Sequence, residues 1–196
     1  MKRLLVITVL CVFTMSGCEL RIESENCPSL RKVKQQKTKK KCPFGNCPPT
    51  NIPRAFREDN YGGGSCNHAA MITVLRYHGL HKWAERWRRS RGGGIGASGL
   101  ADLAESDGLR FACTLDGDTK FLDWCSRTRR PAAIHYYHEH AITFCGYVNG
   151  NAILIDNNDT QQLIRVRKAT FIKNWKGYGG CAIAVLYEPP IPQPWI

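Results

Sequence analysis

The sequence predicts an α+β fold, in which helices come first and pack on an antiparallel sheet that follows them in the chain. Apolar residues recur at helical spacing over residues 67–106, whereas short runs bounded by turn residues fill most of residues 132–187. Strands grouped in this way are expected to pair as an antiparallel sheet. A chain of 196 residues is long enough for one such domain with a buried core and shorter appended segments.

The first half of the domain is expected to hold four helices and one strand. The first helix carries its apolar residues on one stripe and ends at Gly79, since glycine favours the C-terminal position of a helix. The second helix places Trp83 and Trp87 inward, and Ser98 and Asp118 are polar residues of the kind that cap the third and fourth. The expected helices span residues 67–78, 80–90, 99–106 and 118–126, and the strand spans residues 109–115.

The second half of the domain is expected to form the rest of the sheet. Asn149-Gly150 is a strong signal for a two-residue type I′ hairpin turn, because both residues tolerate positive φ. A further turn is expected at residues 157–159. The predicted strands span residues 132–137, 140–148, 152–156, 162–166 and 181–187, with a short helix over residues 170–175.

The first 17 residues have the features of a signal peptide. Two basic residues precede an apolar run over residues 4–15, which is too short to cross a membrane. The segment Thr14-Met15-Ser16-Gly17-Cys18 resembles the lipobox of bacterial lipoproteins, in which the cysteine is lipidated and becomes the new N-terminus. The resemblance implies a lipid anchor at Cys18, and Glu19 favours the outer membrane of the cell envelope. Cleavage without lipidation, which gives a soluble secreted protein, is the alternative.

A basic tether is expected between this signal and the domain. Seven of the eleven residues 31–41 are Lys or Arg, and so dense a block of like charge repels itself and stays solvated. Near anionic lipid headgroups, each such charge adds ~1 kcal/mol to membrane binding. Nucleic acid is not the expected partner of an exported chain without aromatic residues interleaved with the charges. The expected segments are a signal peptide over residues 1–17, a tether over 18–54, the domain over 55–188 and a proline-rich tail over 189–196.

A cysteine that follows a run of glycines is the strongest functional signal in the chain. Residues 62–64 are glycines, which allow positive φ and a close approach of the backbone to a ligand. Cys66 follows at the expected N-terminus of the first helix, where the helix dipole favours the thiolate over the thiol. The alternative from this stretch alone is a buried cysteine that begins a helix after a flexible turn.

The remaining cysteines point to an exported protein. Ten cysteines are many for a cytosolic enzyme of this size. Cys42 and Cys47 are placed for a local disulfide, and two CxxC pairs at zinc spacing do not occur, so no metal site is expected. The mature chain holds seven cysteines besides Cys18 and Cys66, and this odd number leaves at least one unpaired. Cys145 is the expected buried free thiol.

A cysteine nucleophile needs a histidine within hydrogen-bond reach, and the histidine needs a partner that orients it. His68 is turned away from Cys66 by the geometry of the helix. His140 begins a strand whose hairpin partner ends in Asp156-Asn157, so the antiparallel register is expected to place these two residues opposite it. The alternative is a histidine at a strand end that is capped by a polar turn.

Several short motifs occur in one order along the chain: Asn60-(x5)-Cys66 with Gly64-Ser65-Cys66, His140-Ala141-Ile142, Gly146-Tyr147, and Ile153-Leu154-Ile155-Asp156-Asn157. This series resembles the papain-type cysteine peptidases, and most nearly the bacterial peptidases related to the bacteriocin-processing (double-glycine leader) family. The resemblance covers about residues 60–186. It implies a papain-like cysteine peptidase fold and hydrolysis of a peptide bond through a thioester, without a cofactor.

The resemblance also implies roles for five residues. Cys66 corresponds to the nucleophile and His140 to the general base and acid. Asn60 lies where the family has the glutamine of the oxyanion hole, with the backbone N–H of Cys66 as the second donor. Because side chains alternate along a strand, only one of Asp156 and Asn157 faces His140. The Ile-Leu-Ile-x-Asn pattern favours Asn157, whereas the count from His140 favours Asp156.

Two other functions remain open from the sequence. Asparagine at position 60 is one methylene shorter than glutamine, so the first alternative is a catalytically inactive papain-like binding module at the cell envelope. The second is another Cys-His amide hydrolase that acts on cell-wall peptides, for which Asp-Cys-Ser would be expected in place of Ser65-Cys66-Asn67. The expected partners are a peptide or protein substrate and, through Cys18, a membrane. The sequence does not indicate the oligomeric state.

Overall fold

The computed structural model describes residues 50–89, 94–137 and 140–190. Within these ranges, no helix is long and apolar enough to cross a membrane. The predictions that lie outside the described residues are the signal peptide over residues 1–17, the lipidation site Cys18, all but the end of the basic tether, the pair Cys42 and Cys47, and most of the tail.

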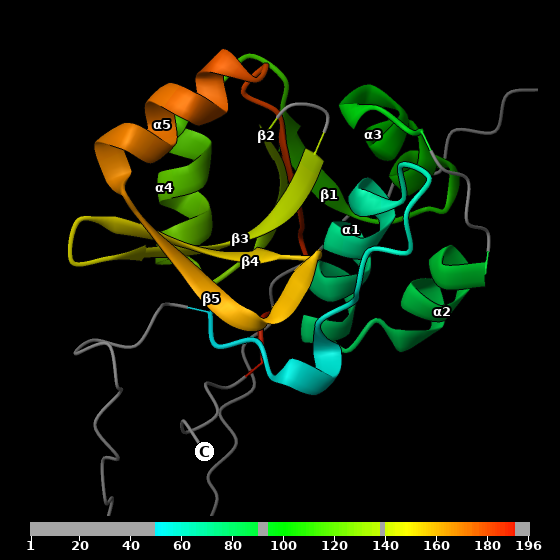
Figure 1. The fold of residues 1–196 in the computed structure, drawn as a ribbon. Coiled ribbons are helices and arrows are strands. Elements are labelled where there is room, and N and C mark those ends of the chain that lie inside the picture. Colours follow the sequence, from blue (N-terminus) through cyan, green and yellow to red (C-terminus); the bar gives the residue numbers. More distant parts are fainter. Residues whose placement is uncertain (1–49, 90–93, 138–139, 191–196) are drawn as a thin grey trace, which may run out of the picture. The chain divides into compact units, whose positions relative to one another are not determined.

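A six-stranded antiparallel sheet forms the centre of the domain (Figure 1). Its strands follow the order β1-β6-β2-β3-β4-β5, so the last strand of the chain lies between the first two. Every neighbouring pair is antiparallel, which confirms the predicted α+β class. The strands are β1 (Phe111–Thr114), β2 (Ala132–Tyr137), β3 (His140–Val148), β4 (Asn151–Asp156), β5 (Asp159–Arg167) and β6 (Ala182–Val185).

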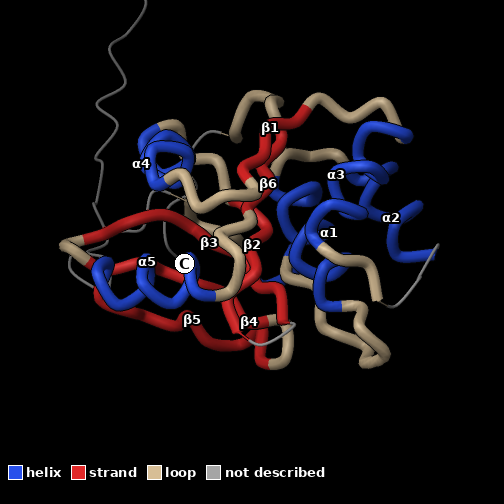
Figure 2. The backbone as a smooth tube through the Cα atoms, turned by 90° about the horizontal axis from the view of Figure 1, so that it is seen from above, coloured by secondary structure: helices blue, strands red, loops and turns tan. Residues whose placement is uncertain are grey.

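Helices cover both faces of this sheet (Figure 1 and Figure 2). The N-terminal helices α1–α3 lie on one face, as expected, and α4 and α5 cover the other. Side-chain alternation separates the two layers, because Ala133 and Ile183 face α1–α3 whereas Ala132 and Ala182 face α4 and α5. The helices are α1 (Cys66–Tyr77), α2 (His81–Arg89), α3 (Ala97–Ser106), α4 (Thr119–Arg127) and α5 (Lys168–Gly177), preceded by a 3₁₀ turn at Arg54–Phe56.

Helix α1 is more deeply buried than its amphipathic sequence predicts. All twelve of its residues are buried, because α2, α3, the sheet and the segment before residue 60 surround it. The segment is attached through the backbone N–H of Glu58, which donates to the hydroxyl of Thr73 at 3.0 Å. Glu58 also pairs with Arg76 in the last turn of α1 at 2.5 Å. A buried charge of this kind is tolerated because it is paired.

The turn between β3 and β4 follows the sequence prediction. Asn149 and Gly150 have φ of +47° and +73°, which confirms the two-residue type I′ hairpin. The register between these strands then shifts between Phe144 and Gly146, which leaves Cys145 as the extra residue of a bulge. This shift was not predicted, and it changes which residues meet at the far end of the hairpin.

The ends of several strands differ from the prediction. β5 begins at Asp159 instead of residue 162, because Asn157 and Asn158 alone make the turn and Asp156 pairs with Asp159. The strands expected over residues 109–115 and 181–187 are shorter, since β1 and β6 pair over only four residues each. The residues just beyond these ends still favour a strand by their sequence, but they do not pair with the neighbouring strand.

Candidate active site

Cys66 is the first residue of α1, where the glycine run places it. The glycines at positions 62–64 have φ of +80°, +60° and +80°, a left-handed region that side chains with a Cβ rarely adopt. The backbone N–H of Ser65 donates to the carbonyl of Gly62 at 3.1 Å and closes the turn. The Cys66 residue is only 4% exposed. Its position at the positive end of α1 favours a thiolate.

A short hydrogen bond joins His140 to Asp156. The Nε2 atom of His140 lies 2.8 Å from Oδ1 of Asp156, and both side chains are mostly buried, at 15% and 19% exposed. The side chain of Cys66 is hydrogen-bonded to the same imidazole. Because Nε2 is engaged by Asp156, Nδ1 is the ring nitrogen that remains for Cys66. The three side chains form a Cys-His-Asp series.

Side-chain alternation explains why Asp156 faces the ring. Ile142 and Leu154 both pack in the cluster that lies against α4 and α5. His140 precedes Ile142 by two residues on β3, and Asp156 follows Leu154 by two residues on β4. Residues two apart on a strand point to the same face, so His140 and Asp156 meet at the edge of that face.

The strand register differs from the expectation that His140 lies directly opposite Asp156-Asn157. The last β4 residue that pairs with β3 is Ile155, which lies opposite Thr143. If this register is continued past the last pair, His140 lies at the level of Asn158. The bulge at Cys145 sets this alignment. His140 and Asp156 therefore meet as diagonal neighbours beyond the paired region, a distance that long side chains span.

The side chain of Asn157 points to the opposite side of the chain from that of Asp156 and does not contact the His140 ring. It is only 3% exposed, and its Nδ2 donates to the carbonyls of Cys66 and Ala141, each at 2.9 Å. These two bonds tie the first turn of α1 to β3. The geometry therefore separates the two candidates that the sequence left open: Asp156 contacts His140, and Asn157 holds the elements that carry Cys66 and His140.

The ionisation of Cys66 and His140 is coupled. Burial favours the neutral thiol, but hydrogen bonds from His140 and from the backbone of Ala141 outweigh it, so the pKa of Cys66 is lowered. The hydrogen bond to Cys66 raises the pKa of His140; burial opposes this rise, and the hydrogen bond and charge of Asp156 add to it. Both shifts favour the thiolate–imidazolium pair.

Asn60 lies next to the glycine turn, and its side-chain amide is hydrogen-bonded through its oxygen and through one of its two Nδ2 hydrogens. Its backbone N–H donates to the carbonyl of Asn157 at 2.6 Å. Its Oδ1 accepts from Oγ of Ser65 at 2.6 Å and from the backbone N–H of Gly62 at 3.2 Å, and its Nδ2 donates to Oδ1 of Asn158 at 2.9 Å. The structure therefore joins Asn60 both to the loop that presents Cys66 and to the turn that follows Asp156.

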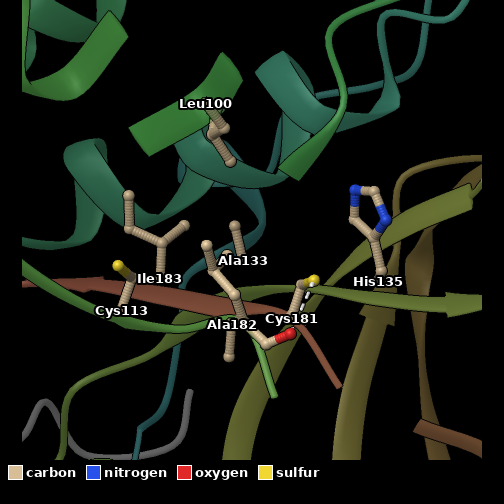
Figure 3. Close-up of a pocket in the computed structure, with 8 residues that line it drawn as sticks. Leu100, Cys113, Ala133, His135, Cys181, Ala182 and Ile183 are labelled. Atoms are coloured by element: carbon tan, nitrogen blue, oxygen red, sulfur yellow. Dashed lines mark hydrogen bonds between the residues drawn. The ribbon is translucent and has the colours of Figure 1, made fainter. Parts of the chain in front are cut away.

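A second histidine, His135, contacts the residue that follows Cys66. Nε2 of His135 lies 2.8 Å from Oδ1 of Asn67, the residue after Cys66. Burial lowers the pKa of His135, and the nearby His140 lowers it further, so its neutral form is favoured. His135 lines a narrow apolar pocket between α3 and the sheet, together with Leu100 of α3 and with Cys113, Ala133 and Ile183 of the sheet (Figure 3).

The histidines in α1 and at its C-terminal end contact other groups. His68 is buried with its ring edge against Trp87, at 6.0 Å between ring centroids, and burial lowers its pKa. His78 lies at the end of the helix, where its Nδ1 is 3.3 Å from the carbonyl oxygen of Glu188. Burial lowers the pKa of His78 to about 4.

The five cysteines of the described residues are all free thiols. Cys145 is 1% exposed, which confirms the predicted buried free thiol. Burial raises its pKa to about 12, so it remains a neutral thiol. Within the described ranges, no group of three or more His, Cys, Asp or Glu side chains is placed to hold a metal ion.

Sequence reasoning missed two contributors to the site, Asn158 and the pair of His135 and Asn67. The sequence assigns Asn158 only to a turn, although the run of three polar residues directly after β4 is a signal that this turn faces other polar groups. Asn67 has no feature in the sequence that distinguishes it from an ordinary helical residue. Its contact with His135 depends on the pairing of β2 with β3, which places His135 opposite Ala141.

Comparisons with known proteins identify the fold. No family model matches the sequence, and no curated protein matches it. A C39-like peptidase from Bacillus anthracis matches the structure with a TM-score of 0.58 and 13% sequence identity, over 71% of this chain and 96% of that chain. The peptidase domain of Streptococcus ComA, a bifunctional ABC transporter of a quorum-sensing pathway, matches with a TM-score of 0.52 and 19% identity, over 68% and 97%.

A third solved structure is a double-glycine-motif protease from an AMS/PCAT transporter, in complex with the leader peptide. It matches with a TM-score of 0.53 and 16% identity, over 72% of this chain and 94% of that chain. At such identities the similarity shows the fold alone. The chain therefore has the papain-like fold of C39-like peptidases, which confirms the fold class predicted from the sequence.

Proposed function

We propose that this chain is a cysteine peptidase, in which Cys66 is the nucleophile, His140 the general base and acid, and Asp156 the residue that orients His140. The observation that carries the proposal is the 2.8 Å contact between Nε2 of His140 and Oδ1 of Asp156, with Cys66 hydrogen-bonded to the same ring. A carboxylate that holds one ring nitrogen leaves the other free to exchange a proton with the thiol.

The first half of the reaction is attack by the Cys66 thiolate on the carbonyl carbon of a peptide bond. The new S–C bond forms as the carbonyl electrons move to the oxygen, which becomes an oxyanion. The backbone N–H of Cys66 and the amide of Asn60 are the proposed donors to this oxyanion, at the positive end of α1. When the C–N bond breaks, the leaving amine takes the proton from Nδ1 of His140, and a thioester remains.

The second half is hydrolysis of this thioester. His140, now neutral, removes a proton from a water molecule, whose oxygen attacks the thioester carbon. The C–S bond then breaks, Cys66 leaves as the thiolate, and the imidazolium is restored. Every proton in this sequence passes through His140, so no cofactor is required.

The proposed substrate is a peptide or a protein. One of the structurally similar proteases was solved with a leader peptide, and we extend only this class of ligand to the present chain. The surface beside the catalytic residues supports the extension. Tyr61 is 50% exposed just before the glycine run, and Tyr137, 39% exposed, stacks on His140 at 6.3 Å between ring centroids. Exposed aromatic rings beside a nucleophile suit contact with an extended peptide.

The proposed location is the bacterial cell envelope, with the chain anchored through a lipid on Cys18. Support for this part comes from the sequence alone, since the short apolar run and the lipobox-like segment precede that cysteine. We expect labelling with a radioactive fatty acid in a bacterial host to be lost in Cys18→Ala and kept in Cys47→Ala. Labelling that persists in Cys18→Ala would rule out this anchor.

Hydrolysis is tested with a mixture of peptides of diverse sequence, followed by mass spectrometry of new termini. The wild-type protein is expected to generate new termini, whereas Cys66→Ser and His140→Asn are not. His81→Asn is the matched control, because His81 is an exposed histidine on α2. Cleavage that survives in Cys66→Ser would refute the assignment. A wild-type protein that cleaves no peptide would instead support the inactive binding module.

A further inference from the structure

Four hydrogen bonds join the β4–β5 turn and the start of β5 to the segment that leads into the glycine run. This segment also contacts α1 through Glu58, so it connects the helix that carries Cys66 to the strand end that carries Asp156. The bonds run from Asn60 N to Asn157 O at 2.6 Å, from Asn60 Nδ2 to Asn158 Oδ1 at 2.9 Å, from Thr160 Oγ1 to Asp59 Oδ1 at 2.6 Å and from Arg57 Nη1 to Thr160 O at 2.8 Å.

Ser65 determines which way the side-chain amide of Asn60 faces. The backbone N–H of Tyr61 donates to Oγ of Ser65 at 3.0 Å, and the hydroxyl hydrogen of Ser65 remains for another acceptor. That Oγ lies 2.6 Å from the Asn60 side chain, and donation requires an oxygen there. The backbone N–H of Gly62 approaches the same atom at 3.2 Å. Oδ1 of Asn60 therefore faces these two donors, and Nδ2 faces Asn158.

Asn158 holds the other end of this amide and also contacts the catalytic histidine and its partner. Its Oδ1 accepts one of the two Nδ2 hydrogens of Asn60 at 2.9 Å. Its backbone N–H donates to Oδ1 of Asp156 at 2.9 Å, and its Nδ2 lies 3.3 Å from Nε2 of His140. Asp156 thus accepts from His140 and from the backbone N–H of Asn158, and the side chain of Asn158 lies between His140 and Asn60.

We propose that Asn158 is a positioning residue, which fixes the amide plane of Asn60 so that the second Nδ2 hydrogen is presented to the carbonyl oxygen of the substrate. This inference rests on the proposed peptidase function. An amide group is planar, so bonds to its oxygen and to one of its hydrogens also set the direction of the other hydrogen. Donors that are held in place before the oxyanion forms stabilise the transition state without reorganisation.

The test is hydrolysis of N-acetylglycine p-nitrophenyl ester, a small ester that needs few contacts beyond the acyl group. Loss of one oxyanion donor lowers kcat roughly 10²–10³-fold, and this is the effect expected for Asn60→Ala. Asn158→Ala is expected to lower kcat at least roughly tenfold, because the donor is misplaced, with little change in KM. The double variant should be no slower than Asn60→Ala, since residues that act as a unit are not additive.

A second measurement separates positioning from general damage. Alkylation of Cys66 by iodoacetamide needs the thiolate but no oxyanion donor, so its rate should be unchanged in Asn158→Ala. Asn158→Asp retains the acceptor for Asn60 and should recover most of kcat. Its added negative charge near His140 raises the pKa of that residue, so the alkaline limb of the pH profile should move to higher pH. Gln161→Ala, an exposed amide in the adjoining strand, is the matched control.

Three outcomes would overturn the inference. The first two apply if the wild-type protein hydrolyses the ester. An unchanged kcat in Asn158→Ala would show that Asn158 does not act through Asn60, and so would a fall in kcat of the double variant equal to the product of the two single effects. A fall in alkylation that matches the fall in hydrolysis would assign the effect to the thiolate instead. These results leave the peptidase function intact. A wild-type protein that alkylates at Cys66 but hydrolyses no ester would contradict the peptidase function, and this inference with it.

Discussion

Nε2 of His140 and Oδ1 of Asp156 lie 2.8 Å apart, although the two residues are not register partners in the sheet. The contact arises because a bulge shifts the β3–β4 hairpin while alternation keeps both side chains on one face. A hydrogen bond at this distance fixes the plane of the imidazole ring. It thereby aims the other ring nitrogen at Cys66, which lies on a different layer of the fold.

Asp156→Asn is expected to move the alkaline limb of the pH–rate profile to lower pH. The hydrogen bond to Cys66 and the carboxylate of Asp156 both raise the pKa of His140, so the imidazolium persists to higher pH than in an isolated histidine. Removal of the negative charge lowers that pKa, and the ion pair is lost earlier as pH rises. The measurement is kcat/KM against pH. Asp159→Asn, on the other side of the same turn, is the matched control, and an unmoved limb in Asp156→Asn would contradict the assignment.

Asn157 should matter for stability, and a carboxylate should be worse there than no polar group. Its Nδ2 donates to the carbonyls of Cys66 and Ala141, and the residue is buried. Asn157→Ala removes two buried hydrogen bonds, at a cost of about 0.5–1.5 kcal/mol for each. Asn157→Asp places a negative charge against both oxygens, so we expect a larger loss in urea unfolding. Wild-type stability in Asn157→Asp would show that these two bonds do not form.

The fold class and most elements followed from periodicity and turn chemistry. The start of α1 at the glycine run and the Asn149-Gly150 hairpin are local features, in which φ preferences of single residues decide the outcome. The burial of α1 on all sides was not predictable in this way. It depends on α2, α3, the sheet and the distant segment around Glu58, none of which affects the pattern within α1.

The sequence names every residue of the proposed Cys-His-Asp series, but it does not choose between Asp156 and Asn157. That choice depends on the register and on the bulge at Cys145, and a bulge that leaves alternation intact on either side has no clear signal in a single sequence. The same holds for Asn158. Its contact with Asn60 joins positions 98 residues apart, so only the folded arrangement brings them together.

Acid is expected to destabilise the fold through His78. Burial and the nearby Arg130 lower its pKa to about 4, and the hydrogen bond to the carbonyl of Glu188 only partly opposes them. Between pH ~6.5 and about 4 the unfolded chain binds the proton and the folded chain does not, so stability falls as pH decreases through this window. The loss is at most about 3 kcal/mol.

Urea unfolding at several pH values measures this dependence. His78→Asn, which retains a donor for the carbonyl of Glu188, should reduce the slope of stability against pH between 4 and 6.5. His81→Asn, an exposed histidine on the next helix, should leave the slope unchanged. An equal slope in the wild-type protein and His78→Asn would contradict the account.

Gly180→Ala should destabilise the domain, whereas Gly177→Ala should not. Gly180 has φ of +63°, and a Cβ there would lie 2.4 Å from the Cα of Gly117. Gly177 is the last residue of α5, with open space around it, so alanine there is expected to be neutral or to stabilise by about 0.5–1 kcal/mol. Thermal unfolding compares the two. Equal melting temperatures for the two variants would show that the close approach of Gly117 and Gly180 is not maintained.

The most direct test of the central claim is the pH dependence of Cys66 alkylation by iodoacetamide, followed by mass spectrometry of the peptide that contains this residue. In the wild-type protein, the rate should rise at a pH below the ordinary pKa of a cysteine, ~8.5, because His140 stabilises the thiolate. In His140→Ala the same rise should move to higher pH. Identical profiles for the two proteins would contradict the thiolate–imidazolium pair, and with it the assignment of Cys66 and His140 as the catalytic residues.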